Sequence, residues 1–583
     1  MAVAKARPSV VSIIVRTLIS IVFLAVYFWF ALPPLNLRAP AFWTFAFFGA
    51  AVIAVIFLVG NFVTGISTKR HKNGTVEIDG QALKSMFGRF PLAVKILAGA
   101  AALVIAVYLL SAFIFSPLFF ASSYRDMLQT QTGDFTEDIS EISWTQIPVV
   151  DRDSASRLGS RKLGEIDELV SQFEVAENYT QINYQDRATR VTPLLYGDFF
   201  KWMKNQATGI PAYISVDMAT QETQLKWLDQ PIRYSESEYF MRNIHRYLRF
   251  AYPTKLFDDV SFEIDENGTP YWVASTYTYR FGLASGHDAN GAVLVNAVTG
   301  EHQFYAVGDI PSWVDQVYDA DMILTQLAYY GEYQNGFWNS VFGQTGVKYP
   351  TDGYNYLAID DDVWLYTGMT SAGGDESNVG FVLVNLRTKE TKYYAVPGAE
   401  EYSAMSSAEG QVQHLGYEAT FPLLINVSDR PTYFMSLKDN AGLVKMYAFV
   451  DVEQYQIVGT GNTVELARKA YTEKLSENDV HLGTGDPDNA VSTEITGTIQ
   501  EIRSAVENGN TVYYFTLVED YTVTDPTSSV FGGYYKAEIS ASHLLPFWKA
   551  GDKVTFTIKG GRGELNAVTA VKSWQMAGLT GQP

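Results

Sequence analysis

A run of evenly spaced arginines is the clearest candidate for binding chemistry in the sequence. Within 235–250, which reads SESEYFMRNIHRYLRF, Arg242, Arg246 and Arg249 recur every three or four residues. That spacing places side chains on one face of a helix, and the run opens with a capping-box pattern and stops before a proline. A basic helix face either pairs with neighbouring carboxylates or binds an acidic polymer such as teichoic acid. We therefore predict a helix over 235–250 and take its arginines as candidate partner-binding residues.

Carboxylate and histidine patterns give no comparable site. The chain holds 7 histidines, and no pair has the HExxH spacing that puts two zinc ligands on one helical face. The acidic run Asp360, Asp361, Asp362 lacks the glycine and glutamate of an EF-hand, so we interpret it as a turn before a strand. GxSxG, SxxK and phosphate-loop patterns are missing, and so is cysteine. The sequence thus predicts no catalytic residue, no metal ligand and no cofactor, although paired carboxylates far apart in sequence would leave no signature.

A charged segment over 147–167, IPVVDRDSASRLGSRKLGEID, offers a second possible surface. Asp151 or Asp153 can cap a short helix that bears several basic residues, which favours a solvated helix start. The alternative is an anion-binding or docking surface for a partner.

The elements that would position these residues are organised by an internal repeat. The segment 291–307, GAVLVNAVTGEHQFYAV, is nearly repeated at 380–396 as GFVLVNLRTKETKYYAV. Each copy reads as a strand, a break at an asparagine and a second strand, which is a hairpin pattern. The key Val-(Asp/Asn)-x-x-Thr-x-Glu also occurs at 216–222, and a degraded copy over 442–458 lacks the threonine and shortens the turn. We expect the valines of the full copies at equivalent strand positions and their threonines at equivalent turn positions.

The repeated pattern of an aromatic strand, a strand reading Val-x-Val-Asn/Asp-Ala-x-Thr-Gly-Glu and a returning strand resembles the PepSY group of extracytoplasmic domains. The best match is 293–304, with looser matches near Ile214 and Val382, and together they touch most of 209–458. The resemblance implies small α+β, cystatin-like modules with a helix packed on an antiparallel sheet. It also implies that they bind or restrain partners rather than catalyse. A further helix expected over 312–330 agrees with this plan.

Apolar runs before residue 124 predict a membrane anchor. They cover 10–32, 41–64 and 92–120, and each has the roughly 20 residues that a helix needs to cross a bilayer. Lys and Arg cluster before the first run and after the second, so the positive-inside rule places the N-terminus in the cytoplasm and the chain after residue 120 outside. The runs carry no charge at their centres, which favours anchoring over ion transport.

The C-terminal part is predicted to be a separate β-rich unit after a polar linker over 479–492. Its candidate strands are 494–503, 511–518, 534–539, 553–558 and 565–571. Their order and the Gly-Asp-Lys-Val at 551–554 resemble the OB-fold, a five-stranded, partly open barrel that binds oligonucleotides or oligosaccharides. Tyr513 and Phe515 share one strand face and are candidate ligand-binding residues. Acidic residues lie among the basic ones here, which argues against nucleic acid as a partner.

Composition and order along the chain complete the prediction. With 583 residues and a net charge of −20, the chain is long enough for several domains and too acidic for a protein-wide role on nucleic acid. The predicted fold class is α+β: a membrane anchor (1–122), a juxtamembrane α/β segment (123–208), repeat regions (209–350 and 351–478), the linker, and a barrel (493–575). We expect a non-enzymatic binding or scaffolding protein in the plasma membrane of a Gram-positive-type envelope, with an envelope protein or wall polymer as partner. An envelope hydrolase with dispersed carboxylates, or oligosaccharide or single-strand binding by the barrel, are the alternatives.

Overall fold

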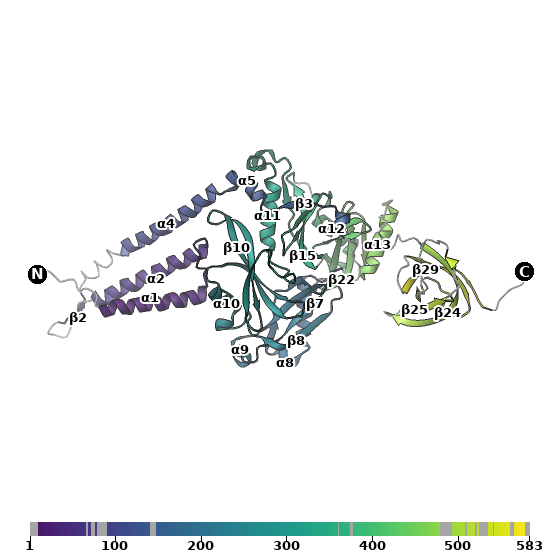
Figure 1. Cartoon of the computed structure of the whole chain (residues 1–583), viewed down its shortest axis with the longest axis horizontal. Helices are drawn as coiled ribbons and strands as arrows, with labels where there is room; N and C mark the ends of the chain where they lie inside the picture. The colour runs from purple at the N-terminus through teal and green to yellow at the C-terminus, as the bar shows by residue number, and fades with distance from the viewer. Residues whose placement is uncertain are drawn as a thin grey trace, which may run out of the picture.

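Apolar helices, a β-rich body and a separate C-terminal sheet follow one another along the chain in the computed structural model (Figure 1). The structure describes residues 10–65, 68–70, 76–78, 90–139, 147–359, 361–373, 377–478, 492–507, 510–518, 522–523, 534–539, 541–559 and 565–577. Within these ranges the chain is α+β, and nearly all strand pairs are antiparallel.

Among the described residues, 3 helices are long and apolar enough to cross a membrane: α1 (Val10–Ala31), α2 (Pro40–Gly65) and α4 (Phe90–Ile114). The short strands β1 (Thr68–Arg70) and β2 (Val76–Ile78) pair between α2 and α4. The predicted span over 92–120 ends early, because Pro117 begins a new helix, α5 (Pro117–Arg125), after the extended residue Ser116. Proline suits the first turn of a helix, where its missing N–H is not needed, and it cannot continue the helix before it.

Residues 149–461 repeat one plan, in which a helix precedes a meander of antiparallel strands. We number the modules 1 to 4: 149–232, 233–306, 317–394 and 398–461. Their helices are α7 (Arg152–Gly164), α10 (Ile244–Ala251), α11 (Ala320–Glu332) and α12 (Glu401–Gln411).

The meander of each module pairs its strands in chain order. In module 1 they are β5 (Thr180–Asn183), β6 (Ala188–Tyr196), β7 (Ile210–Asp217) and β8 (Thr223–Ile232). In module 2 they are β9 (Leu256–Ile264), β10 (Pro270–Phe281), β11 (Ser285–Asn296) and β12 (His302–Ala306). In module 3 they are β14 (Asn355–Ile359), β15 (Asp362–Ser371), β16 (Ser377–Asn385) and β17 (Thr391–Tyr394). In module 4 they are β20 (Leu423–Val427), β21 (Arg430–Lys438), β22 (Val444–Asp451) and β23 (Val458–Gly461).

Shorter elements extend these sheets or cover them. The added strands are β3 (Thr130–Thr132), β4 (Phe173–Val175), β13 (Lys348–Pro350), β18 (Gly398–Ala399) and β19 (Glu418–Ala419). The added helices are α6 (Phe135–Asp138), α8 (Asp167–Val170), α9 (Phe199–Asn205), η1 (Phe240–Arg242), η2 (Asn339–Gly343), η3 (Gln413–Leu415) and α13 (Val464–Glu477).

The turn between the last two strands makes the same hydrogen bonds in modules 1, 2 and 3. Its first residue, Asp217, Asn296 or Asn385, accepts the N–H groups of the residues two and three positions later through Oδ1. The hydroxyl of the threonine accepts the N–H of the glutamate. These side chains bond their own backbone and so specify the turn locally. The strand pairs that flank it are Val216 with Thr223, Val295 with His302 and Val384 with Thr391, which confirms the predicted equivalence of the turns.

The fourth turn differs from the prediction. In module 4 Val450 lies opposite Val458, so the turn is one residue longer than in the other modules, not shorter. Asp451 still begins it and accepts the N–H of Gln454, but no threonine follows.

Each module is closed by a contact between its first residues and this turn. The carbonyl of Met218 accepts the N–H groups of Val149 and Val150, and the carbonyl of Ala297 accepts those of Arg233 and Tyr234. In module 3 the carbonyl of Leu386 accepts the N–H groups of Val317 and Tyr318. In module 4 the carbonyl of Val452 accepts the N–H of Ala399. The segment that leads into the helix is thereby held beside the last hairpin. Each module therefore begins with the segment that leads into its helix. The repeat regions inferred from the turn pattern were placed at 209–350 and 351–478 instead.

The helix predicted over 235–250 is shorter in the structure. Ser235 does accept the N–H of Glu238, as in a capping box, but the chain then forms η1 and turns again. Helix α10 begins at Ile244, where Asn243 caps it by accepting the N–H of Arg246. The helix predicted over 312–330 likewise begins later, at Ala320, after its cap Asp319.

The predicted C-terminal strands are present with small changes of length. They are β24 (Ser492–Glu507), β25 (Asn510–Leu517), β27 (Tyr534–Glu538), β28 (Lys553–Lys559) and β29 (Leu565–Gln575), with the short β26 (Thr522–Val523) and η4 (Leu545–Phe547). Strand pairing leads from β24 through β25, β27, β29 and β28 back to β24, and only β27 and β29 pair in parallel among these strands.

Candidate functional site

The arginines that were expected to bind a partner make contacts within the chain. Arg249 is 8% exposed, and it donates to the carbonyls of Leu32, 3.0 Å away, and Lys255, 2.7 Å away. Arg246 lies over the ring of Trp29, with its guanidinium carbon 4.6 Å from the ring centroid. These groups attach α10 to the end of α1, so they do not form an open basic face.

The third arginine of the predicted stripe is also bonded within the chain, and burial changes the pKa of Arg249. Arg242 donates to the carbonyl of Gln206 at 3.0 Å. Burial lowers the pKa of Arg249 to about 10, which still leaves it charged at neutral pH. The three arginines thus hold module 2 to α1 and to the neighbouring module, and their binding of a partner stays a prediction.

The candidate aromatic residues of the C-terminal sheet differ in exposure. Phe515 is 2% exposed and packs against Tyr535, Trp548 and Phe556, so it belongs to the core of this sheet. Tyr513 on the same strand is half-buried and packs against that core. Phe515 cannot stack on a ligand without unfolding this core.

Several carboxylates inside the modules are neutralised by arginine. Asp362 accepts two bonds from Arg387, at 2.6 and 2.7 Å, and one from Asn385 at 2.8 Å. In module 4 Arg430 donates to both oxygens of Asp451, which is fully buried. Both aspartates form bidentate contacts with a guanidinium group, in which two hydrogen bonds strengthen the ion pair. Asp360 lies outside the described residues, and Asp361 has a φ of 68°, as expected for a turn.

A second buried carboxylate group makes no ion pair with the Lys and Arg residues that the structure describes. Glu263 and Asp315 are 0% and 1% exposed, and the N–H of Asp315 donates to Glu263 at 2.9 Å. Asp315 in turn accepts the N–H of Asn183, so the pair joins modules 1 and 2. Burial raises the pKa of Glu263 to about 7, and burial together with Glu263 raises that of Asp315. With no exposed surface, this pair cannot contact a substrate, which argues against its use in hydrolysis.

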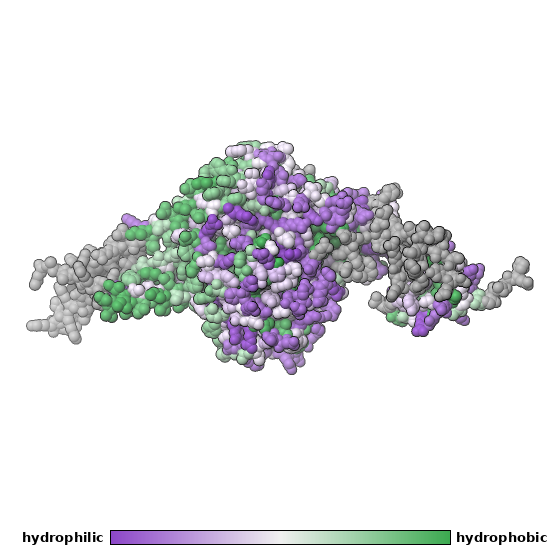
Figure 2. Space-filling model, viewed as in Figure 1, coloured by the Kyte–Doolittle hydropathy of each residue, from purple (hydrophilic) through white to green (hydrophobic). Residues whose placement is uncertain are grey.

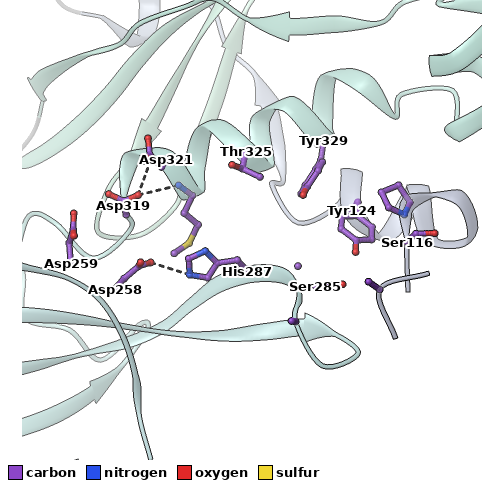
Figure 3. A pocket seen from close by; sticks show the side chains of 15 residues that line it. Ser116, Tyr124, Asp258, Asp259, Ser285, His287, Asp319, Asp321, Thr325 and Tyr329 are labelled. Carbon is purple, nitrogen blue, oxygen red and sulfur yellow. Dashed lines mark hydrogen bonds and ion pairs between the residues drawn. The ribbon is translucent and has the colours of Figure 1, made fainter. Parts of the chain in front are cut away.

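A cavity of about 520 Å³ lies where α4 and α5 meet modules 2 and 3 (Figure 3). Ala112 and Ser116 contribute from the end of α4 and the start of α5, and Tyr124 from α5. Thr325 and Tyr329 extend into it from α11 in Figure 3. The hairpin of β10 and β11 supplies the residues from Ala284 to His287.

This pocket, which we call the acidic pocket, is lined by Asp258, Asp259, Asp319 and Asp321. Asp258 lies 3.1 Å from Nε2 of His287, as Figure 3 shows. Asp259 and Asp321 are exposed, and no Lys or Arg is among the described residues that line the pocket. Four carboxylates therefore face at most one histidine charge.

Local structure explains why these carboxylates converge. Asp319 caps α11 by accepting the N–H groups of Asp321 and Met322, so the chain before the helix is held at the pocket. The tip of the β10–β11 hairpin is held by Leu283, whose N–H donates to Oγ of Ser111 in α4 at 2.9 Å. Gly286 has a φ of 67°, and a Cβ there would lie 2.5 Å from the ring of Phe281. Glycine thus allows the hairpin to adopt this positive φ without a clash between a Cβ and the ring of Phe281.

The electrostatics of the pocket favour a cation. Burial raises the pKa of Asp319, and the negative charges of Asp259 and Asp258 raise it further. A bound positive charge would reverse this effect, because opposite charges within a few ångströms stabilise the ionised carboxylate. No group of His, Asp and Glu among the described residues has the arrangement of a metal site.

The acidic pocket was not predicted from the sequence. Its acids come from β9 and the start of α11, and the only local signals were two short acidic pairs, Asp258-Asp259 and Asp319-x-Asp321. Acidic pairs are common on the surface of an acidic protein, and only the tertiary fold brings these together.

Comparisons with known proteins leave the family open. No family model matches the chain, and no curated protein matches it. Among solved structures, the crystal structure of a mutant levansucrase from B. megaterium matches 77% of this chain and 99% of that chain. The sequence identity is 10% and the TM-score is 0.17, a likeness that carries no argument about fold or function.

Proposed function

We propose that this chain is a membrane-anchored, extracytoplasmic binding or scaffolding protein of a bacterial cell envelope. Its N-terminus lies in the cytoplasm, and modules 1 to 4 and the C-terminal sheet lie outside. The partner is an envelope protein or a wall polymer that presents a positively charged group. The acidic pocket binds that group.

One observation carries this proposal: among the described residues that line the acidic pocket no Lys or Arg accompanies the four carboxylates, whereas Asp362 and Asp451 in modules 3 and 4 have arginine partners. Its walls include the half-buried Tyr329, whose ring can add cation–π attraction. The pocket also lies beside the end of α4, so a partner held there would be close to the membrane.

The plan of the modules and of the C-terminal sheet supports a binding role. A helix packed on an antiparallel meander is the architecture that the PepSY resemblance implies, and that group binds or restrains partners. The ring of strand pairs from β24 to β28, with its parallel β27–β29 pair, supports an OB-like barrel. The buried position of Glu263 and Asp315 argues against these two carboxylates as a hydrolytic pair.

A charge-neutralising pair of substitutions tests the pocket. In purified full-length protein we expect Asp258→Asn with Asp259→Asn to weaken binding of an oligolysine probe by about tenfold, equivalent to roughly 1.4 kcal/mol. The control is Asp229→Asn, an exposed acid on β8 outside the pocket. Binding is measured by fluorescence anisotropy of the labelled probe. Equal affinities of the double variant and the control would contradict the proposal.

The partner itself can be trapped in cells. A photo-crosslinking residue at Thr325, which is exposed in the pocket, should capture an envelope component, and the double variant should reduce its yield. The same crosslinker at Trp227, 59% exposed on β8, is the matched control. Capture that is the same at both positions would show that the pocket is not the contact.

A further inference from the structure

Module 2 is attached directly to the ends of the apolar helices, without an intervening stalk. The N–H of Leu35 donates to the carbonyl of Pro253 at 2.7 Å, and Nδ2 of Asn36 donates to that of Thr254 at 3.0 Å. Arg249 reaches Leu32, and Leu283 reaches Ser111, as described above. If α1, α2 and α4 cross the membrane, these contacts place α10 at the boundary where the helices leave the bilayer.

An exposed apolar surface lies next to this attachment. Helix α9 and η1 pack together through rings, with Trp202 5.8 Å from Phe240 and Phe199 5.1 Å from Tyr239. Their outer side chains remain open to solvent. We call them the apolar ridge; their exposed fractions are Phe199 41%, Phe200 72%, Met203 51%, Phe240 60% and Met241 42%.

The apolar ridge continues onto the apolar helices. Arg246 donates to the carbonyl of Phe240 at 2.8 Å while its guanidinium lies over Trp29 of α1. Phe250, at the end of α10, packs edge-on against Phe28 at 5.5 Å. Figure 2 shows that hydrophobic surface extends from the apolar helices onto the adjoining side of the body. Trp29 is also the residue type that gathers at membrane interfaces.

One residue of the apolar ridge has an unusual backbone conformation. Phe240 has a φ of 52°, a left-handed conformation that a side chain of this size rarely adopts, and its ring is 60% exposed. Lys201 and Lys204 lie on the same short helix, where Lys201 pairs with Asp198 at 3.5 Å. The ridge thus combines apolar and basic side chains, as interfacial segments do. Lys204 adds a positive charge that suits anionic lipid headgroups despite the net charge of the chain.

From these observations we infer that the apolar ridge inserts into the outer interface of the bilayer that α1, α2 and α4 cross. The lipid bilayer covers the ridge, which explains why these side chains are exposed in the isolated chain. Module 2 is then held to the membrane at two places, the helix ends and the ridge. This inference rests on the helices crossing the membrane and is independent of what the acidic pocket binds.

Absence of cysteine from the chain makes the test direct. Phe240→Cys and Phe200→Cys proteins, full length, are labelled with a small fluorophore and reconstituted in vesicles of phosphatidylcholine and phosphatidylglycerol. Trp227→Cys, at a site of similar exposure on β8, is the control. We expect lipids with a quencher near the headgroup to quench the label at 240 and 200 several-fold more than at 227. Iodide in the aqueous phase should give the opposite order.

Two outcomes would overturn the inference. Iodide quenching at 240 and 200 equal to that at 227, without lipid quenching, would show that the ridge faces water. Shielding from both quenchers would show that a protein, including a second copy of this chain, covers it. Because Phe240 contacts Trp202, its replacement can disturb folding, and Met203→Cys then gives the same measurement from α9. Vesicles without phosphatidylglycerol separate the apolar contribution from that of Lys201 and Lys204.

Discussion

The aspartates of the module interiors and those of the acidic pocket show two uses of the same residue type. Asp362 and Asp451 are buried beside arginines that neutralise them, whereas Asp259 and Asp321 lie exposed in a pocket with no Lys or Arg among its described lining residues. Charge buried in a fold must be paired, because leaving it unpaired costs several kcal/mol. Charge left unpaired at a cavity costs little while water reaches it and is available to a ligand. The comparison predicts opposite results for substitutions at the two places.

The largest effect is expected at the buried pair of module 4. Arg430→Ala leaves Asp451 as an uncompensated buried charge, so the free energy of unfolding should fall by about 3–5 kcal/mol. Thermal and denaturant unfolding in detergent, followed by tryptophan fluorescence, measures this. The control is Arg503→Ala, since Arg503 and Glu501 form a pair whose side chains are 80% and 59% exposed and whose loss should not be detectable. Similar losses for both variants would remove the distinction between buried and exposed charge.

The second effect concerns pH at the carboxylate pair that has no arginine. The pKa of Glu263 is raised from 4.5 to about 7 in the folded chain, so its contribution to stability is present below about pH 4.5 and is lost as pH rises through 7. We expect the midpoint of thermal unfolding to be lower at pH 8 than at pH 5.5. Glu263→Gln, which cannot ionise, should reduce this difference. A pH dependence that is unchanged in Glu263→Gln would assign it to other groups.

The smallest effect on stability is expected in the acidic pocket. Asp259→Asn removes a negative charge that acts on Asp319, so the midpoint of thermal unfolding at pH 7 should stay unchanged or rise. Asp319→Asn should behave similarly, because asparagine can also cap α11. A clear loss of stability in Asp259→Asn would mean that this acid has a structural partner, and the contrast with Asp451 would fail.

Local interactions decided how much of this fold could be predicted from sequence. The turns of modules 1 to 3 were predictable because Asn296, Thr299 and Glu301, and their counterparts, bond one another's backbone within a few residues. The spans α1 and α2 and the C-terminal strands were predictable from apolar runs and alternation. The start of α10 was not, because Ser235 satisfies its local capping pattern while the chain still turns away before Asn243.

Tertiary contacts decided what could not be predicted. The stripe of Arg242, Arg246 and Arg249 had correct spacing but was assigned to a partner, since nothing in the sequence shows that Leu32 and Trp29 come to meet it. The acidic pocket combines β9, α11 and the β10–β11 hairpin with the end of α4, so no single segment carries its pattern. Phe515 was a candidate ligand-binding residue, because the alternation of side chains along a strand does not distinguish a ligand-binding face from a core face.

The closure of each module by its own turn has a consequence for how such a chain arises. Because the carbonyl of Ala297 holds the backbone of Arg233 and Tyr234, the two ends of a module lie side by side. A duplicated gene segment could therefore be inserted in series without threading one sheet through another. Charged pairs stay within a single copy, and their order differs: aspartate precedes arginine in Asp362–Arg387, and arginine precedes aspartate in Arg430–Asp451.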